Sequence, residues 1–422
     1  MFARRFACVW LLMLSLLFLP PTQAAAQAGQ LDPTFGTGGI VTTDFGDQNS
    51  SNNAATANAA VIQPDGKIVV VGAAPGSNDF PIAAVLRYNS NGSLDSSFGT
   101  GGIVTTSSIE DQPFTSVALQ SDGKIVAVAG GFSAFVARYT SAGALDPTFG
   151  TGGIATLADI NGPAASGVVI QPNGEVLVAD RNIFLLLSNG QPDTSFGTGG
   201  TAYNAGYPAT TLTLLANSEI LTASTQDASG FISQYQSSGA LDTTFGISGQ
   251  LPTPGTSPGL VLLGTGEFLT GGTLINNSAH GANGAVANAF AVARYLAVGI
   301  ADASFGTNGG TTTSVPNYPS VMTSGLAVQP SGDIVIVGTA SHSTTTSFAL
   351  ARYTASGQLD TTFGNSGTVV TIFGGGFPAP EVSANGVTIQ PDGKIVVVGS
   401  YVISVPHHGF DTAIKVLRYL GS

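Results

Sequence analysis

Histidine is the first residue type to consider for a functional site, because a neutral imidazole can bind a metal ion or transfer a proton near neutral pH. The four histidines are His280, His342, His407 and His408. They lie in three separate segments, so a shared metal site requires the fold to bring those segments together. No regular spacing links them, and we favour exposed loop positions for all four.

A second candidate is the segment Asp47-x-Asn49-x-Ser51-x-Asn53, which has oxygen-bearing side chains at alternate positions. Calcium loops use this pattern, because a hard cation prefers oxygen ligands. The segment lacks the glycine at its sixth place and the glutamate at its twelfth, where asparagines stand instead. We therefore favour a flexible polar loop and predict no cofactor, with calcium as the alternative.

One serine lies in a pattern that is typical of nucleophiles, Gly255-Thr256-Ser257-Pro258-Gly259. The pattern Gly-x-Ser-x-Gly activates a serine only where it joins a strand to a helix. Here the surrounding residues are rich in proline and glycine, and no helical periodicity follows. We therefore assign no catalytic role to Ser257.

An Arg-Tyr pair recurs with an aspartate eight residues after the arginine. A guanidinium and a carboxylate at a fixed spacing predict a structural ion pair, or an arginine–carbonyl bond, more readily than a catalytic group. The arginines are Arg87, Arg138, Arg294, Arg352 and Arg418, the last of which finds its aspartate only if the chain closes on itself. In two further copies Leu185 and Gln234 replace the arginine.

These aspartates belong to a longer motif, Leu31-Asp32-Pro33-Thr34-Phe35-Gly36, which returns in the looser form Asp-x-x-Phe-Gly. Asp followed by Pro suits a β-turn, Phe supplies an apolar plug, and Gly can take a positive φ. Self-similarity at this period predicts a repeat protein, and seven equivalent sites indicate a packing requirement. The seven copies are 47 to 63 residues apart and contain Asp32, Asp95, Asp146, Asp193, Asp242, Asp302 and Asp360.

Each repeat contains four short runs that predict strands. In the first repeat the runs are 57–63, 68–73, 82–88 and 102–106, and the first two flank a hairpin signal, Asp65-Gly66. The nearly continuous apolar run 68–73 predicts a strand that is buried on both faces. Four antiparallel strands at this period predict an all-β fold, a seven-bladed β-propeller of four-stranded antiparallel blades. A solenoid is the alternative, but it would use shorter units.

The two ends of the chain predict how the ring closes. After its leader the chain begins with the motif and a strand at Ile40–Thr43, and it finishes with a strand at Ala413–Leu420 that no motif follows. The N-terminal strand supplies what the last repeat lacks. We therefore predict that it closes the last blade, which removes two open sheet edges.

We divide the chain into a signal peptide at 1–26, a short linker at 27–30 and a propeller at 31–422. Two arginines precede an apolar run from Phe6 to Leu19, and a cleavage site with small residues follows at Ala24-Ala25-Ala26. A retained membrane anchor is the alternative, although the run is shorter than the ~20 residues that a span needs. We expect a secreted protein, extracellular or periplasmic, with no membrane association after cleavage.

The composition narrows the choice of partners. Charged residues make up 9% of the chain, and its 12 basic and 24 acidic residues give a net charge of −12. This acidity disfavours nucleic acid and anionic membranes, which bind basic surfaces. The only cysteine, Cys8, lies in the leader, so we predict no disulfide or thiol chemistry in the mature chain. We expect a monomer.

Three segments together resemble a known family. They are Leu-Asp-x-x-Phe-Gly-x-x-Gly, Gln-Pro-Asp-Gly-Lys-Ile-Val-Val-Val-Gly at 63–72 and again at 390–399, and Ala-Arg-Tyr. Across residues 31–422 the chain resembles the delta-60 repeat family of secreted bacterial proteins. The resemblance implies a propeller and an extracellular location, and it implies no activity.

Propeller geometry sorts the connections into two faces. Turns between the first and second strands, and between the third and fourth, lie on what we call the constant face, because they vary little here. The other connections lie on the variable-loop face, where recognition usually evolves on a rigid scaffold. We therefore predict a non-catalytic binding or scaffold protein that uses its variable-loop face to hold an unknown protein, polysaccharide or small ligand.

The alternative function is a hydrolase, lactonase or lyase with its site at the mouth of the channel. Such an enzyme needs acidic, histidine or arginine side chains that converge there, often on a metal. The acidic candidates on the variable-loop face show no recognisable spacing, and we predict no catalytic, cofactor-binding or metal-binding residue. These candidates are Asp47, Asp79, Glu110, Asp111, Asp159, Asp227 and Glu381.

Overall fold

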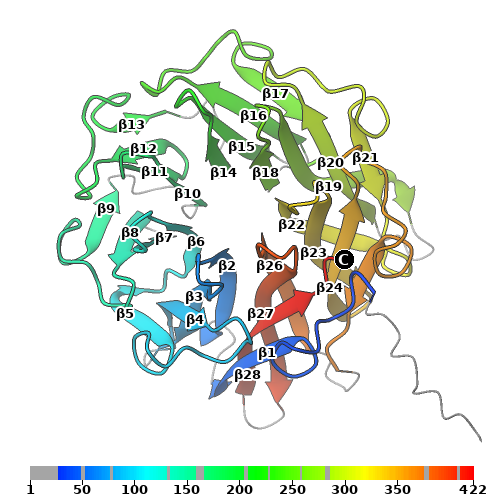
Figure 1. The fold of residues 1–422 in the computed structure, drawn as a ribbon, viewed down its shortest axis with the longest axis horizontal. Coiled ribbons are helices and arrows are strands. Elements are labelled where there is room, and N and C mark those ends of the chain that lie inside the picture. Colours follow the sequence, from blue (N-terminus) through cyan, green and yellow to red (C-terminus); the bar gives the residue numbers. More distant parts are fainter. Residues whose placement is uncertain are drawn as a thin grey trace, which may run out of the picture.

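Seven four-stranded sheets form a closed ring (Figure 1). The structure is a computed structural model, and it describes residues 27–48, 53–76, 79–130, 134–157, 166–203, 208–226, 229–256, 259–280, 286–374, 380–405 and 409–422. The predicted all-β, seven-bladed propeller is confirmed. Among the residues described, no helix is long and apolar enough to cross a membrane.

The first four blades follow one another along the chain. Blade one consists of β2 (Thr56–Ile62), β3 (Ile68–Pro75), β4 (Pro81–Tyr88) and β5 (Ile103–Glu110). Blade two consists of β6 (Phe114–Leu119), β7 (Ile125–Ala129), β8 (Ala134–Tyr139) and β9 (Ile154–Leu157). Blade three consists of β10 (Gly167–Ile170), β11 (Val176–Ala179), β12 (Ile183–Leu186) and β13 (Thr201–Ala202). Blade four consists of β14 (Ala209–Leu214), β15 (Ile220–Gln226), β16 (Ser229–Tyr235) and β17 (Gln250–Thr253).

The last three blades complete the ring. Blade five consists of β18 (Gly259–Leu262), β19 (Phe268–His280), β20 (Val286–Tyr295) and β21 (Gly310–Thr313). Blade six consists of β22 (Ser320–Val328), β23 (Ile334–His342), β24 (Thr345–Tyr353) and β25 (Thr368–Thr371). Blade seven consists of β26 (Glu381–Ile389), β27 (Ile395–Val405), β28 (Gly409–Tyr419) and β1 (Ile40–Gln48).

The hydrophobic core lies between neighbouring blades. Strand β3 is buried along nearly its whole length, as its continuous apolar run predicts. One face of its sheet packs on the preceding blade, so Val70 and Leu86 share a cluster with Val396 and Val416 of blade seven. Because the second and third strands of a blade are covered by a sheet on each side, they need apolar residues at every position.

The ring closes through the two ends of the chain. Strand β1 pairs antiparallel with β28, with Ile40 opposite Leu417 and Thr43 opposite Ile414. Figure 1 shows this N-terminal strand beside the C-terminal one. The prediction that an N-terminal strand closes the last blade is therefore confirmed. Both strands extend beyond their predicted ranges. Strand β1 continues to Gln48, and β28 begins at Gly409.

Residues 27–30, for which the sequence analysis gives a linker, complete the last turn of the constant face. The Gly29 amide donates to the Leu420 carbonyl at 2.8 Å, and the Leu420 amide donates to the Gln30 carbonyl at 2.9 Å. The Ala28 carbonyl also accepts a hydrogen bond from Gly364 of blade six at 2.9 Å. A turn that is continuous in the other blades is thus assembled here from both ends of the chain.

The innermost strands contain bulges that the sequence analysis did not identify. In β2 the register shifts between Ala57 and Ala59, and the extra residue is Asn58. The side-chain nitrogen Nδ2 of Asn58 donates to the Phe114 carbonyl of blade two at 2.8 Å. A bulge redirects a side chain along the strand, and here it turns a polar group toward the neighbouring blade. Asn385 of β26 makes the matching bond to Ala57 at 2.8 Å.

Candidate functional site

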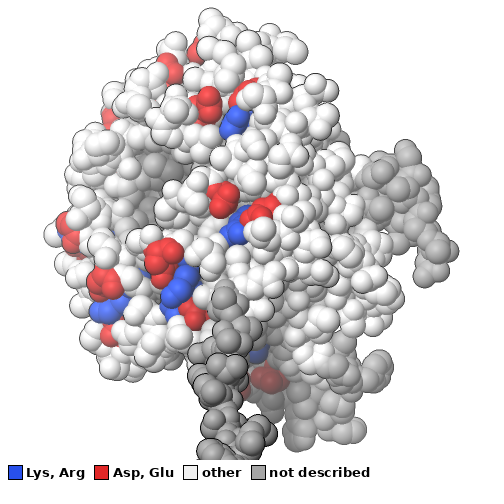
Figure 2. All heavy atoms as spheres, turned by 45° about the vertical axis from the view of Figure 1, so that its right-hand side comes forward, with Lys and Arg blue, Asp and Glu red and all other residues white. Residues whose placement is uncertain are grey.

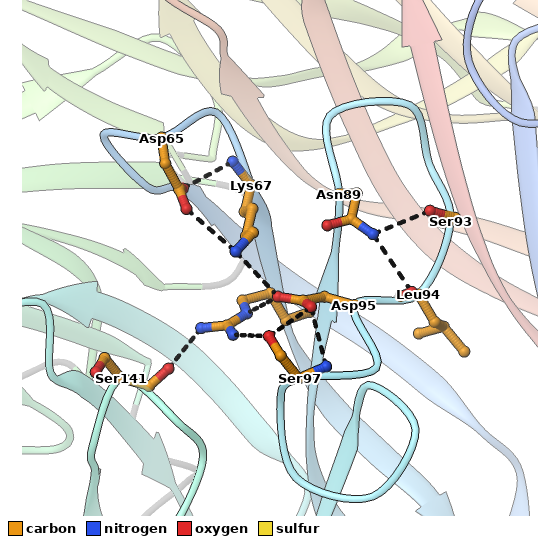
Figure 3. Close-up of polar contacts among 9 residues, drawn as sticks. Asp65, Lys67, Asn89, Ser93, Leu94, Asp95, Ser97 and Ser141 are labelled. Atoms are coloured by element: carbon orange, nitrogen blue, oxygen red, sulfur yellow. Dashed lines mark hydrogen bonds and ion pairs between the residues drawn. The ribbon is translucent and has the colours of Figure 1, made fainter.

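The recurring arginine forms the centre of a polar network on the constant face. In blade one, Arg87 Nε donates to Asp95 Oδ2 at 2.8 Å, and Arg87 Nη1 donates to the Ser141 carbonyl of blade two. Figure 3 shows Asp95 between Lys67 and Ser97, with Ser141 reached from the next blade. We call this unit the turn latch: the arginine, the motif aspartate and the turn carbonyl of the next blade.

The ring of the motif phenylalanine packs against the guanidinium of the latch. The guanidinium carbon of Arg87 lies 4.5 Å from the centre of the Phe98 ring, and this ring is fully buried. Glycine is required in the turn of the next blade, because a Cβ on Gly143, which has a φ of 93°, would lie 3.0 Å from the Phe98 ring. The motif therefore joins two blades through a stacked cation, an ion pair and a close backbone approach.

Five blades contain the latch, as the recurring arginine predicts. The structure adds one contact that the sequence analysis did not specify, since each arginine also reaches the next blade. The carbonyls that accept from the arginines belong to Ser141, Ser188, Ala355, Gly421 and Ser90, in the order Arg87, Arg138, Arg294, Arg352 and Arg418. Arg418 pairs with Asp32 at 2.9 Å, so one latch joins the two ends of the chain.

The latch aspartates are strongly acidic. Burial alone would raise the pKa of Asp32, but hydrogen bonds from the Thr34 hydroxyl and amide, together with Arg418 and Lys394, lower it from 3.8 to about 2. Burial is likewise outweighed at Asp146, where bonds from Thr148 and the nearby cations lower the pKa to about 2. The ionised carboxylate is therefore the form that the folded ring stabilises.

This acidity predicts a loss of stability in acid. Because the folded-state pKa lies below the unfolded value, the stabilisation is complete above about pH 4 and disappears as the pH falls toward about 2. We expect the free energy of unfolding, from urea titrations at a series of pH values, to fall by roughly 1 to 2 kcal/mol per carboxylate. Asp146→Asn should reduce the dependence of the free energy of unfolding on pH. An equal dependence in the natural protein and the variant would contradict the assignment.

Two blades lack the latch, and in each of them different contacts replace those of the arginine. In blade three Leu185 replaces the arginine and packs in a buried apolar cluster with Leu177 and Phe196. In blade four Gln234 replaces it, and its Nε2 donates to Glu219 Oε2 at 2.6 Å. The other side-chain atom, Gln234 Oε1, is buried and has no hydrogen-bond partner among the described residues. A buried hydrogen-bond acceptor without a donor lowers the free energy of unfolding, so its presence requires an explanation.

A pocket of about 480 Å³ lies beside Gln234, between blades four and five. The equivalent pockets between blades two and three and between blades seven and one are lined by Arg138 and Arg418. Here Gln234 and Glu219 line the pocket together with apolar side chains. The apolar residues are Leu214, Leu215, Leu262, Leu263, Ala216 and Ala297.

The blade-five turn and the end of the blade-four motif, which meet at this junction, form an exposed apolar rim. Ile247 is 76% exposed, Val298 64%, Ile300 61% and Leu296 37%. The blade-five turn packs closely on the blade-four motif. A Cβ added to Gly299 would lie only 2.6 Å from the Phe245 ring. We call these four residues and the pocket the apolar sector. At the matching positions of blades five and six the chain has polar residues, namely Thr307, Thr354, Ser356 and Gln358.

The charge at the latch also changes around the ring. In blades one, two and seven a lysine contacts the motif aspartate, as Lys67 does with Asp95 at 3.2 Å. Blade four has Glu219 at this place, and among the described residues no lysine or arginine pairs with Asp242. Figure 2 shows acidic and basic side chains in small mixed groups on a largely uncharged surface. Within the described part of the chain, the junction of blades four and five thus combines a motif carboxylate that has no cationic partner with an exposed apolar rim.

The predicted chemical residues do not converge where the structure describes them. His342 is exposed at the end of β23, and its ring lies 6.3 Å from the Tyr318 ring. Asp79 and Asp111 lie in loops of blade one, whereas Glu381 begins β26 of blade seven. Within the described residues, no three His, Cys, Asp or Glu side chains lie close enough to hold a metal ion. Asp159, Asp227, Ser257, His407 and His408 lie outside the described residues, as do the side chains of Asp47, Glu110 and His280.

One member of the possible calcium segment has a structural role. Asn53 is buried, its Oδ1 accepts from the Gly76 amide at 2.8 Å, and its Nδ2 donates to the Gly76 carbonyl at 2.8 Å. Asn53 therefore fastens the start of blade one to the end of β3. Asn49 and Ser51 lie outside the described residues.

The comparisons with known proteins agree with a propeller repeat. A family model described as a β-propeller domain of unknown function (DUF5122) matches residues 63–98, 120–149, 329–363 and 390–419. These stretches lie in blades one, two, six and seven, so the match omits the three consecutive blades that include Leu185 and Gln234. Among curated proteins, no sequence matches this chain.

Several solved structures resemble the chain at low sequence identity. A catalytically inactive virginiamycin B lyase from Staphylococcus aureus with quinupristin is 13% identical, covers 90% of this chain and 99% of its own, and has a TM-score of 0.47. YCF48 bound to D1 peptide is 11% identical, with 92% and 99% coverage and a TM-score of 0.46. A protein of unknown function from Dyadobacter fermentans is 12% identical, with 90% and 99% coverage and a TM-score of 0.41.

Proposed function

We propose that this protein is a secreted, non-catalytic binding scaffold that holds a partner on its constant face, at blades four and five. The observation that carries the proposal is the apolar sector, where four exposed apolar side chains lie at the same blade junction as a pocket lined by Gln234 and Glu219. Contiguous exposed apolar surface with a polar interior is characteristic of an interaction site.

The rest of the ring suits a scaffold. Latches at five of the seven blades fix neighbouring blades to one another. A rigid frame lowers the entropy that a binding surface loses when it meets a partner. The site therefore lies where the repeated network is interrupted, on a frame that the same network holds in place.

This proposal moves the site away from the variable-loop face. The exposed large apolar residues that the structure describes on that side are spread over blades one, three and six: Phe80, Tyr203, Met322 and Ile372. The apolar sector by contrast gathers such residues at one junction. Its exposed side chains are aliphatic, which favours a protein or peptide partner over a polysaccharide, because sugars stack best on aromatic rings. None of the described side chains favours the alternative of a hydrolase, lactonase or lyase.

Site-specific photo-crosslinking in the producing cells tests the proposal. A crosslinking residue at Val298 is expected to give a discrete product in the exported fraction, because Val298 lies at the centre of the apolar rim. The matched position in blade six, Ser356, and a position on the variable-loop face, Phe80, are expected to give none. A product at Phe80 with none at Val298 would place the site on the variable-loop face and reject the proposal.

A further inference from the structure

We propose that the pocket between blades four and five binds an arginine side chain of the partner, flanked in the partner by apolar residues. The proposal rests on the proposed function and names the chemistry that the apolar sector recognises. It follows from a comparison of blade four with the blades that retain their own arginine.

Blade four lacks the arginine that occupies this position in the latched blades. In the latched blades a guanidinium pairs with the motif aspartate, lies over the motif phenylalanine and donates to a turn carbonyl of the next blade. The corresponding groups in blade four are Asp242, Phe245 and the carbonyl of Ala297. Gln234 is shorter than arginine and turns toward Glu219 instead. The recognition surface for a guanidinium is therefore present without its guanidinium.

Blade three lacks its arginine too, but it leaves no comparable site. Leu185 is only 4% exposed and packs in the core with Ile183 and Ile220. An apolar replacement of similar reach compensates for a lost polar partner by burying surface. Blade four instead places a polar side chain at the position and leaves Oε1 of Gln234 without a donor.

The charge and the walls of the pocket both suit arginine. Glu219 supplies a carboxylate on the pocket wall. Asp242, the motif aspartate of blade four, pairs with no lysine or arginine among the described residues. A planar guanidinium carries five donors, enough for a carboxylate, the Gln234 oxygen and the Ala297 carbonyl together. Its methylene stem can pack along leucines such as Leu215 and Leu263, as long basic side chains do on apolar surface.

The exposed rim indicates what flanks the arginine. Ile247 and Val298 lie at the same blade junction, with most of their side chains in solvent. Burying them requires apolar groups next to the arginine in the partner, and each buried methylene adds to the affinity. A segment of the form apolar-Arg-apolar meets both requirements of the sector.

Calorimetric titration of the folded ring with two short peptides tests the inference. The probes are acetyl-Leu-Arg-Leu-amide and its citrulline counterpart, which has nearly the same shape without the charge. We expect the arginine peptide to bind about tenfold or more tightly than the citrulline peptide, because hydrogen bonds to charged groups are the stronger ones.

Three variants separate the possible outcomes. Gln234→Arg combined with Glu219→Lys restores the pattern of blades one, two and seven, so it should fill the position internally, keep the thermal midpoint and abolish the preference for arginine. The matched change Leu185→Arg in blade three should leave peptide binding as it is. Val298→Ser with Ile300→Gln, the residues of blade six, should weaken both peptides.

The outcomes also distinguish this inference from the proposed function. If both peptides bind equally and Val298→Ser with Ile300→Gln weakens both, the sector is a binding surface but the arginine preference is rejected. If the restored variant binds the arginine peptide as the natural protein does, the inference is rejected as well. If neither peptide binds the natural protein, the inference fails, and crosslinking at Val298 decides the proposed function independently.

Discussion

A chain that ends at Arg352 is expected to show no cooperative unfolding transition. The truncation removes β25 and the C-terminal strands of blade seven, so β1 loses its partner β28 and the Arg418–Asp32 latch is lost. Two inter-blade cores then open to water, because blade seven contributes to the clusters on both of its sides. The expected loss is the whole free energy of unfolding, about 5 to 15 kcal/mol for a domain.

Calorimetry and circular dichroism of the truncated and complete chains measure this effect. A circular permutant is the matched control, because Gly29 and Leu420 already share a hydrogen bond of 2.8 Å and the ends can be joined by a short linker. Opened in the loop between β5 and β6, it keeps every strand and should melt cooperatively. A native-like melt of the truncated chain would show that the blades do not depend on closure.

Arg138→Ala is expected to lower the free energy of unfolding by about 3 to 5 kcal/mol. This is the usual cost of removing one partner from a buried ion pair and leaving the other charge behind. Arg138 is 4% exposed, and among the described residues Asp146 would keep Lys124, at 3.4 Å, as its one cationic partner. The Ser188 carbonyl of blade three would lose its donor as well. Urea denaturation measures the change, and ligand binding at blades four and five should be unaffected.

Two further variants test the reason for this loss. Arg138→Lys keeps a charge but not the planar fork, so it should recover only part of the stability. Arg138→Ala combined with Asp146→Asn removes the stranded charge, so it should cost less than the sum of the two single changes. A loss below about 0.5 kcal/mol for Arg138→Ala, the range of ordinary surface changes, would contradict a structural role for the latch.

Most of the fold follows from local patterns in the sequence. Period, turn chemistry and apolar runs predict blades of four strands, because each of these signals acts within about 60 residues of chain. The two ends of the chain also predict closure. The last repeat ends after its third strand, at Tyr419, and the motif that should follow stands before Ile40. The bulge at Asn58 has no such signal, because a bulge depends on a neighbouring blade that the local sequence does not specify.

The candidate site was harder to predict for a physical reason. The exchange of arginine for Gln234 is visible in the sequence, but its meaning depends on the turn of the next blade, which is far along the chain at Ala297. The exposed rim is equally hidden, because Val298 and Ile300 read as ordinary apolar residues until their exposure is known. The histidines and loop carboxylates are predicted on the other face, where the described groups do not converge.

Methyl-resolved NMR of the complete protein during titration with acetyl-Leu-Arg-Leu-amide shows directly whether blades four and five bind the arginine. We expect shifts confined to the apolar sector, in the methyl groups of Leu215, Leu263, Ile247 and Val298. The same titration with the citrulline peptide should move them less. Shifts centred on the variable-loop face, or none at the sector while binding is measured, would show that the binding site lies elsewhere.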